Sequence, residues 1–305
     1  CMIVHMTTRP TPDFIKAGAI AARVLSEVVK EVRPGVKVIR ICQLAEQKIA
    51  EYGGKPAFPC NVSIDDEAAH YTSPHGDKRV FPDKGLVKVD LGAHVNGHLS
   101  DTAVTVDLDG SYEKFVVAAK TALEGAIEVI EPGVKLGEVG AVIEREIKKH
   151  GLRPIHQLSG HQLKPWILHA GKTVPNVGMR RSERMNLGEA FAIEPFSTDG
   201  NGTIKGSKDA YIFSNVMSSK KKLDRLSAQI RNIARRRFGT LPWAGRWLND
   251  KKIDVTAALH SLLRANAIRA YPVLLEGKGG MVAQFEHTVF VAEEGAIVTT
   301  RPNRQ

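Results

Sequence analysis

The 305-residue sequence has few cysteines, no long apolar run and, over one segment, almost no acidic residues. Its three cysteines, Cys1, Cys42 and Cys60, lack the spacing of metal ligands, so we interpret them as reduced thiols of a cytoplasmic protein. No apolar run approaches the roughly 20 residues that span a bilayer, and the first ten residues lack a signal-peptide core. We therefore expect neither a membrane protein nor an exported one.

The bulk composition indicates a soluble globular protein, with 43% hydrophobic and 25% charged residues. The length leaves room for one large domain or two ordinary ones. No segment resembles a dimer interface, so we expect a monomer.

The positive charge is concentrated in one segment. The formal net charge is +10, but residues 205–270 alone hold 15 Lys and Arg against 4 Asp and no Glu, an excess of +11. Such runs are commonly a solvated face, and they can also bind phosphate groups.

An internal repeat underlies the chain. Residues 25–56 align without gaps on residues 123–154, at an offset of 98 positions. Each copy predicts a helix, a Pro-Gly break, a second helix and a Gly stop. Sheet is expected after each helix pair, at 86–108 in the first half and at 188–196 and 281–292 in the second. Two related α+β halves predict pseudo-twofold symmetry, with a site where their sheets meet.

The segment 85–108 places two carboxylates among strand-forming residues. Asn96-Gly97 is a strong hairpin signal, because a type I′ turn needs positive φ at both central positions. With that turn, Gly92 faces Asp101 and Asp90 lies diagonally across the ladder, with Cβ atoms about 7 Å apart or less. Two bare carboxylates in the space beside Gly92 would repel, and a cation would remove that conflict. The alternative is a carboxylate pair on the wet face of a hairpin.

Three further segments supply candidate ligands. His161 lies in LSGHQL (158–163), Glu194 in GEAFAIEPF (188–196) and Glu286 in MVAQFEHTVFV (281–291). A lone acid inside an apolar strand is expensive to leave unpaired. Four acids and one histidine in strand surroundings therefore make a plausible set of metal ligands.

From about residue 10 onward, the chain resembles the type 2 methionine aminopeptidases, in the archaeal form without a long N-terminal extension. The similarity lies in an ordered set of motifs: AHYTSP (69–74), KVDLGAHVNGHLSD (88–101), SGHQL (159–163), LHAGKTVP (168–175), FAIEPF (191–196), FGTLPWAGRWL (238–248) and AQFEHT (283–288). The resemblance implies the pseudo-symmetric α+β pita-bread fold of these metallopeptidases, which agrees with the repeat.

The resemblance implies that Asp90, Asp101, His161, Glu194 and Glu286 bind two divalent ions, with Asp101 and Glu286 bridging them. This oxygen-rich set with one imidazole suits Mn²⁺, Fe²⁺ or Co²⁺ at least as well as Zn²⁺. The expected reaction is removal of the N-terminal methionine from nascent proteins and peptides, by attack of a bridging hydroxide on the first peptide carbonyl. Glu194 is the candidate for passing a proton to the leaving amine.

Further positions match residues of that family that contact the substrate. His70 and His169 match two histidines that contact the peptide, and either could stabilise the oxyanion. Phe58, Leu168 and Pro242 fall where the family lines its methionine pocket. The remaining histidines of these segments are interpreted as structural or surface residues: His75, His94, His98 and His287.

Residues 197–272 interrupt the second half. They are predicted to form an inserted, basic, all-helical subdomain, and residues 1–196 with 273–305 to form the catalytic domain. Segments 224–239 and 254–268 are the predicted helices, with Gly239 ending the first and Asp254 or Thr256 beginning the second. The basic segment is also a hypothesised contact with ribosomal RNA.

Two other functions remain open from the residues alone. One is a prolidase or aminopeptidase P, which would share the five ligands but not the AHYTSP loop or the FGTLPWAGRWL insertion. The other is a non-catalytic ribosome-associated paralogue, against which the intact ligand set argues.

Overall fold

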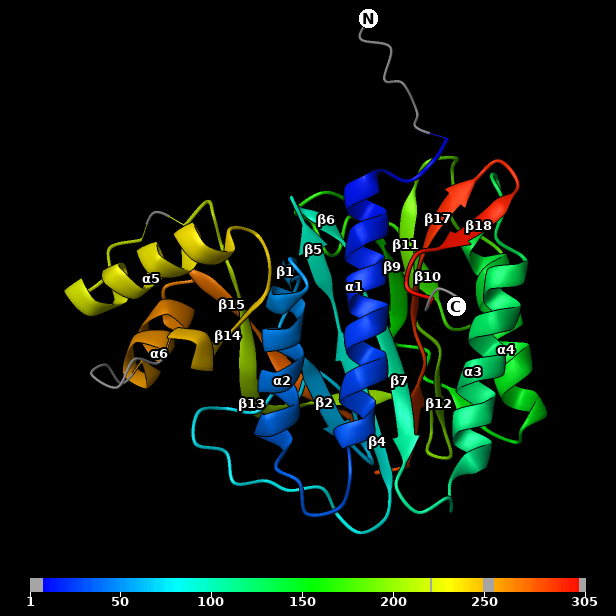
Figure 1. The fold of residues 1–305 in the computed structure, drawn as a ribbon, viewed down its shortest axis with the longest axis horizontal. Coiled ribbons are helices and arrows are strands. Elements are labelled where there is room, and N and C mark those ends of the chain that lie inside the picture. The colour runs from blue at the N-terminus through cyan, green and yellow to red at the C-terminus, as the bar shows by residue number, and fades with distance from the viewer. Residues whose placement is uncertain (1–7, 220, 249–254, 302–305) are drawn as a thin grey trace, which may run out of the picture.

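Two copies of one helix–strand pattern make up most of the molecule (Figure 1). The computed structural model describes residues 8–219, 221–248 and 255–301. The first copy has α1 (Pro12–Val28), η1 (Val29–Glu31), α2 (Val38–Glu51) and β1 (Lys55–Pro56), and the second has α3 (Glu113–Glu128), α4 (Leu136–Lys149) and β8 (Arg153–Pro154). Helices α2 and α4 and strands β1 and β8 keep the predicted offset of 98 residues at both ends. Gly53 and Gly151 end the two helices with φ of 81° and 69°, a backbone conformation in which glycine is unstrained.

The strands of the two halves repeat the same order. The first half contains β2 (Asn61–Ile64), β3 (Glu67–Ala69), β4 (Leu86–Leu91), β5 (Ala93–Val95), β6 (His98–Leu99) and β7 (Thr102–Asp107). The second contains β9 (Ser159–Leu163), β10 (Thr173–Pro175), β11 (Ala190–Ile193), β12 (Phe196–Thr198), β16 (Val282–Gln284), β17 (His287–Ala292) and β18 (Gly295–Val298). Neighbours run β2-β4-β7 in one half and β9-β11-β17 in the other. The predicted pseudo-twofold arrangement is confirmed.

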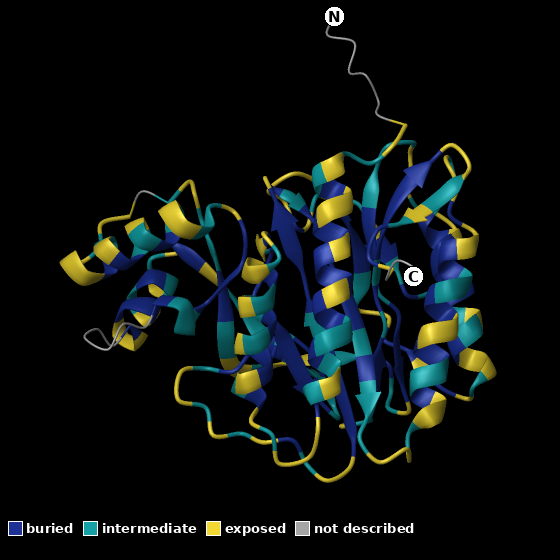
Figure 2. Ribbon diagram, in the orientation of Figure 1, coloured by how far each residue is buried: buried dark blue, intermediate teal, exposed yellow. Residues whose placement is uncertain are grey.

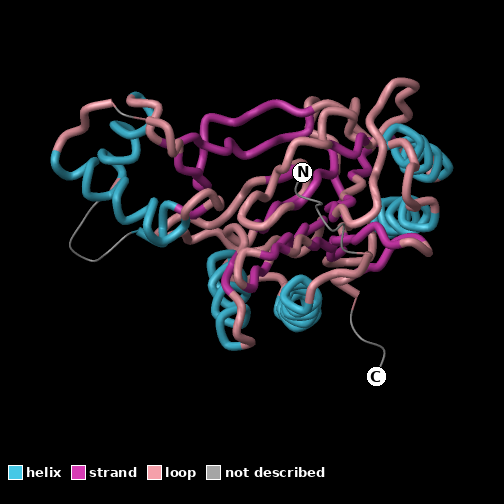
Figure 3. Tube along the Cα trace, turned by 90° about the horizontal axis from the view of Figure 1, so that it is seen from above, coloured by secondary structure: helices cyan, strands magenta, loops and turns pink. Residues whose placement is uncertain are grey.

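The helices lie on the outside of the strands, where their apolar faces are covered. Figure 3 shows α1 and α2 beside the strands of the first half and α3 and α4 beside those of the second. Each helix pair has its own apolar core with its sheet, and the buried residues form the inner faces of the ribbon in Figure 2. None of the described helices is long and apolar enough to cross a membrane. Cys42 and Cys60 are buried free thiols, and Cys1 lies outside the described residues.

The predicted hairpin forms, but it is broken in its middle. Asn96 and Gly97 have φ of 50° and 87°, as a type I′ turn requires. Val95 pairs with His98 on one side of the break and Leu91 with Thr102 on the other, in a single continuous register. That register places Gly92 opposite Asp101, as predicted, and leaves Asp101 outside the ladder.

The two halves join through polar side chains along β7 and β4. The amide of Asp101 donates to Thr288 Oγ1 at 2.7 Å, and Thr102 Oγ1 donates to the carbonyl of Glu286 at 2.9 Å. The buried Lys88 donates to the carbonyls of Asp65 and Val282, both at 2.8 Å. The bonds to Val282, Glu286 and Thr288 fix the strand ends of one half against those of the other.

The insertion is not all-helical, so this prediction is wrong. It contains β13 (Ile204–Asn215), α5 (Arg225–Phe238), β14 (Trp243–Ala244), η2 (Gly245–Leu248), α6 (Thr256–Arg264) and β15 (Ile268–Glu276). Strand β13 carries Gly, Ser and Asp, which weaken strand propensity, and it forms because its residues pair with the distant β15. Strand β15 also pairs with β3 and crosses the predicted boundary at residues 272–273.

Both predicted insertion helices are present. Asp224 caps α5 by accepting from the amide of Ser227, and Gly239 ends it with φ of 56°. Thr256 is the first residue of α6, whereas Asp254 lies outside the described residues.

Two carboxylates attach the insertion to the rest of the molecule. Glu276 accepts four backbone N–H bonds, from residues 201 and 202 before β13 and from residues 278 and 280 after β15. Glu46 on α2 forms an ion pair with Arg246 and accepts from Trp247 Nε1 at 2.8 Å. The insertion therefore has a defined position beside the first half.

Candidate metal centre

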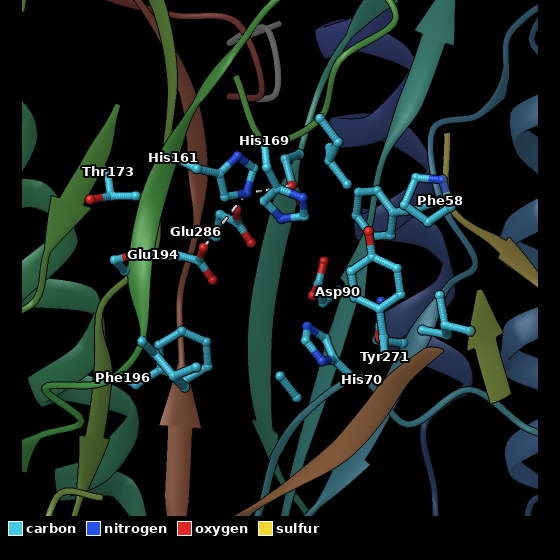
Figure 4. A pocket seen from close by; sticks show the side chains of 18 of the residues that line it. Phe58, His70, Asp90, His161, His169, Thr173, Glu194, Phe196, Tyr271 and Glu286 are labelled. Atoms are coloured by element: carbon cyan, nitrogen blue, oxygen red, sulfur yellow. Dashed lines mark ion pairs between the residues drawn. The ribbon is translucent and has the colours of Figure 1, made fainter. Parts of the chain in front are cut away.

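The five predicted metal ligands lie on one cavity of about 370 Å³. Each comes from the end or middle of a different strand: Asp90 from β4, Asp101 from just before β7, His161 from β9, Glu194 from just after β11 and Glu286 from just before β17. Figure 4 shows four of them, with Asp90 on one side and His161, Glu194 and Glu286 on the other. The repeat explains this convergence, because Asp101 and Glu286 precede equivalent strands of the two halves.

The ligand atoms are close enough to share a cation. One atom each from Asp101, His161 and Glu286 lies within 4.8 Å of the others. His161 Nε2 is 3.5 Å from Asp101 Oδ2 and 3.7 Å from Glu194 Oε1. The imidazole nitrogen thus points at two carboxylates, which is the arrangement expected of a metal-binding histidine.

The electrostatics of the cluster favour a bound cation. Burial and the charge of Asp101 raise the pKa of Asp90 well above its usual value, and burial and neighbouring carboxylates do the same for Glu194 and Glu286. Burial also raises the pKa of Asp101, to about 7, against hydrogen bonds from Glu286 and Asp90 that lower it. Four such acids cannot all ionise together unless positive charge is supplied.

Three buried carboxylate oxygens support the same conclusion. Asp90 Oδ1, Asp101 Oδ1 and Glu286 Oε1 have no hydrogen-bond partner among the described residues. An orphaned buried acceptor costs roughly 1–3 kcal/mol, so such atoms are uncommon unless they bind something. Hard divalent ions prefer oxygen ligands of this kind, and the residues present fit a metal centre.

His70 and His169 face the same cavity. Burial lowers the pKa of His70 to about 4 and that of His169 to about 3, so both rings are neutral at pH 7. Nδ1 of His70 lies 3.3 Å from the carbonyl oxygen of Pro272. Because a carbonyl only accepts, Nδ1 carries the proton and Nε2 is left as an acceptor. The described residues form no hydrogen bond to the ring of His169.

The predicted apolar residues also line this cavity. Phe58, Leu168 and Pro242 are among its lining residues, and Phe58 and Leu168 belong to one buried apolar cluster. The space at Gly92 is taken by Phe58, since a Cβ at position 92 would lie 2.4 Å from its Cε1 atom. Gly92 therefore makes room for the pocket wall.

The four histidines predicted to be structural or surface residues are not among those that line the cavity. The ring of His94 packs edge-on against Trp166, with centroids 5.0 Å apart. His287 shares a hydrogen bond of 2.9 Å with Thr300 Oγ1, and His98 lies 3.4 Å from Thr11 Oγ1. His75 is exposed on a loop. These positions agree with structural or surface roles.

Several residues that line the cavity were missed from sequence. Asn61 lines the cavity because it pairs with Asp90 across β2 and β4. Tyr271 reaches it from β15 of the insertion, with its ring 5.6 Å from that of His70 (Figure 4). Phe196 follows Glu194 and also lines the wall. Only Phe196 carried a sequence signal, since it ends the FAIEPF motif.

Comparison with known proteins identifies the family to which the chain is similar. Residues 13–293 match metallopeptidase family M24. The chain is 42% identical over 295 residues to the methionine aminopeptidase of Methanothermobacter thermautotrophicus, a match covering 94% of this chain and 98% of that protein.

Solved structures share the fold. A thermophilic Arx1 superposes with a TM-score of 0.84 at 17% identity, over 96% of this chain and 91% of that one. A methionine aminopeptidase from Thermotoga maritima gives 0.71 at 22% identity, over 97% and 99%. At these identities the similarity concerns the fold alone.

Proposed function

The chain belongs to metallopeptidase family M24, and from this premise we propose that it removes the N-terminal methionine from peptides and nascent proteins. The observation that carries the proposal is one cavity that joins five metal-binding side chains to an apolar pocket wall. The 42% identity to a methionine aminopeptidase over nearly the whole chain supports the same substrate class.

The enzyme depends on divalent metal, and we propose two ions. Asp101 and Glu286 would bridge them, Asp90 would complete one side and His161 with Glu194 the other. Two such ions would supply an activated water and polarise a carbonyl oxygen when bound. Mn²⁺, Fe²⁺, Co²⁺ and Zn²⁺ are all compatible with this donor set.

The chain's own residues orient the peptide. Phe58, Leu168 and Pro242 surround the methionine side chain, whose unbranched thioether suits an apolar wall. His169 is free to donate to the oxygen of the carbonyl under attack, where charge develops in the transition state. His70 accepts a hydrogen bond at Nε2 from the N–H of the scissile amide. Glu194 passes a proton to the leaving nitrogen.

The decisive experiment combines metal analysis with a test of Glu286. Purified protein is stripped, reloaded with each of the four ions and assayed on a Met-Ala-Ser peptide. The turnover of Glu286→Gln should fall by more than the roughly 10–100-fold that is typical when a residue behind the metal ligands is changed. Glu293→Gln, an exposed acid on the turn after β17, is the matched control. Undiminished turnover of Glu286→Gln would refute the bridging role.

Substrate choice separates the related alternative. A prolidase or aminopeptidase P would cleave Xaa-Pro peptides, whereas we expect release of free methionine from Met-Ala-Ser. Preferential Xaa-Pro cleavage would overturn the methionine assignment while leaving the metal centre intact.

The insertion adds a proposed contact with ribosomal RNA. Its described exposed basic residues spread over β13, the segment just before α5, α5 itself, α6 and β15: Lys205, Lys208, Lys221, Lys222, Arg225, Arg236, Arg237, Arg264 and Arg269. Arg235 instead donates to the carbonyls of Val216, Met217 and Ser219, and Lys220 lies outside the described residues. An enzyme acting on chains that leave the ribosome would benefit from such a contact.

A further inference from the structure

Gln284 lies directly behind the metal cluster and is held rigidly there. It is the last residue of β16, two positions before Glu286, and is 1% exposed. Its backbone N–H donates to Thr105 Oγ1, and that hydroxyl donates back to the backbone carbonyl of Gln284, both at 2.8 Å. Its backbone also pairs with Phe196 of β12. The side chain therefore starts from a fixed point.

The side-chain amide serves one of the proposed ligands. Nε2 donates to Glu286 Oε2 at 3.2 Å. Gln284 is thus a neutral donor to one of the four buried acids.

The bond from Gln284 determines which oxygen of Glu286 remains free. Glu286 uses Oε2 for the amide, and its Oε1 has no partner among the described residues. Gln284 itself does not line the cavity, so it does not reach the peptide.

We propose that Gln284 is a positioning residue, which holds Glu286 with one oxygen turned toward the ions and thereby sets the affinity for metal. This inference rests on the ligand set of the proposed function. Partners of metal ligands orient them and tune their basicity, and their loss typically weakens metal binding about 10–100-fold. A glutamine that only filled the core would influence stability and leave metal affinity unchanged.

The test is calorimetric titration of Mn²⁺ into stripped protein. Gln284→Met keeps the length and removes the N–H donor, and we expect Mn²⁺ binding weakened about 10–100-fold. The Mn²⁺ concentration for half-maximal cleavage of Met-Ala-Ser should rise by the same factor, whereas KM for the peptide at saturating Mn²⁺ should stay unchanged. Gln162→Met, another buried glutamine on β9, is the matched control and should bind Mn²⁺ as the wild type does.

The outcomes separate the two proposals. If the wild type binds no Mn²⁺, the proposed metal centre itself fails. If the wild type binds and Gln284→Met binds equally well, only the positioning role fails, whatever the change in melting temperature. If Gln284→Met does not fold, the same Mn²⁺ titration is carried out on Gln284→Leu. Thermal unfolding of the stripped variant is measured in parallel.

Discussion

His169 combines a neutral ring, exposed at the cavity, with the absence of any hydrogen bond from the described residues. A donor that is not occupied by a protein acceptor is suited to a developing oxyanion, because no bond must be broken when the charge appears. His70 differs, since the carbonyl of Pro272 fixes its tautomer. Two histidines of one cavity are thereby given opposite hydrogen-bonding roles.

This difference predicts the effect of His169→Ala. We expect kcat for Met-Ala-Ser to fall about 10²–10³-fold, the usual cost of losing one oxyanion donor, with little change in KM. Steady-state kinetics at saturating metal measure both constants. His75→Ala removes an exposed histidine and should leave kcat unchanged. A rise in KM with kcat preserved would assign His169 to ground-state binding instead.

At the scale of secondary-structure elements, the break in the hairpin between β4 and β7 leaves space at Gly92 for the pocket wall. The Cβ of an alanine at position 92 would lie 2.4 Å from Phe58 Cε1 and 2.3 Å from the carbonyl oxygen of Ser100. Both neighbours are buried, so neither can move freely. The glycine therefore shapes the wall against which the methionine side chain is proposed to pack.

Gly92→Ala should consequently destabilise the protein and weaken substrate binding. Overpacking of this kind costs about 1–3 kcal/mol, and displacement of Phe58 should raise KM for Met-Ala-Ser. Urea unfolding and steady-state kinetics measure the two effects. Gly206→Ala is the matched control, because the nearest atom to its Cβ is in ordinary contact at 3.5 Å. Equal behaviour of the two variants would show that Gly92 is not required for the wall.

The elements also show how far sequence reasoning reaches. The helices α2 and α4 and the hairpin register followed from local signals: a repeat, Pro-Gly breaks and Asn96-Gly97. Strands β13 and β15 could not be predicted in the same way, because their pairing joins residues more than fifty positions apart and overrides weak propensity.

The same distinction applies to the site. The ten residues taken from motifs all line the cavity, whereas Asn61, Tyr271 and Gln284 were missed. Asn61 and Gln284 reach the cluster through strand pairing, and Tyr271 enters on the insertion. None of the three is an acid or a histidine in an unusual setting, so composition gave no reason to select them.

For the protein as a whole, the charge on the insertion predicts salt-dependent binding to ribosomes. Replacing Lys221, Arg225 and Arg236 by Ala should weaken co-sedimentation. The slope of log K against log salt should fall by about one for each phosphate that is no longer neutralised. Cleavage of Met-Ala-Ser should be unaffected, because none of the three side chains lines the cavity.

The control variant also removes three positive charges, but it removes them from the two halves and leaves the insertion unchanged. Lys16, Lys30 and Lys120 are exposed on helices of the two halves. Their replacement by Ala should leave co-sedimentation unchanged. Binding that is indifferent to salt, or absent at low salt, would contradict an electrostatic contact.

The division of the ligands between the two halves has a consequence for biosynthesis. Asp90 and Glu286 stand 196 positions apart in the chain. At a translation rate of about 5–20 residues per second, the last carboxylate appears roughly 10–40 s after the first. A newly made molecule therefore cannot complete this ligand set until nearly all of its chain has been synthesised.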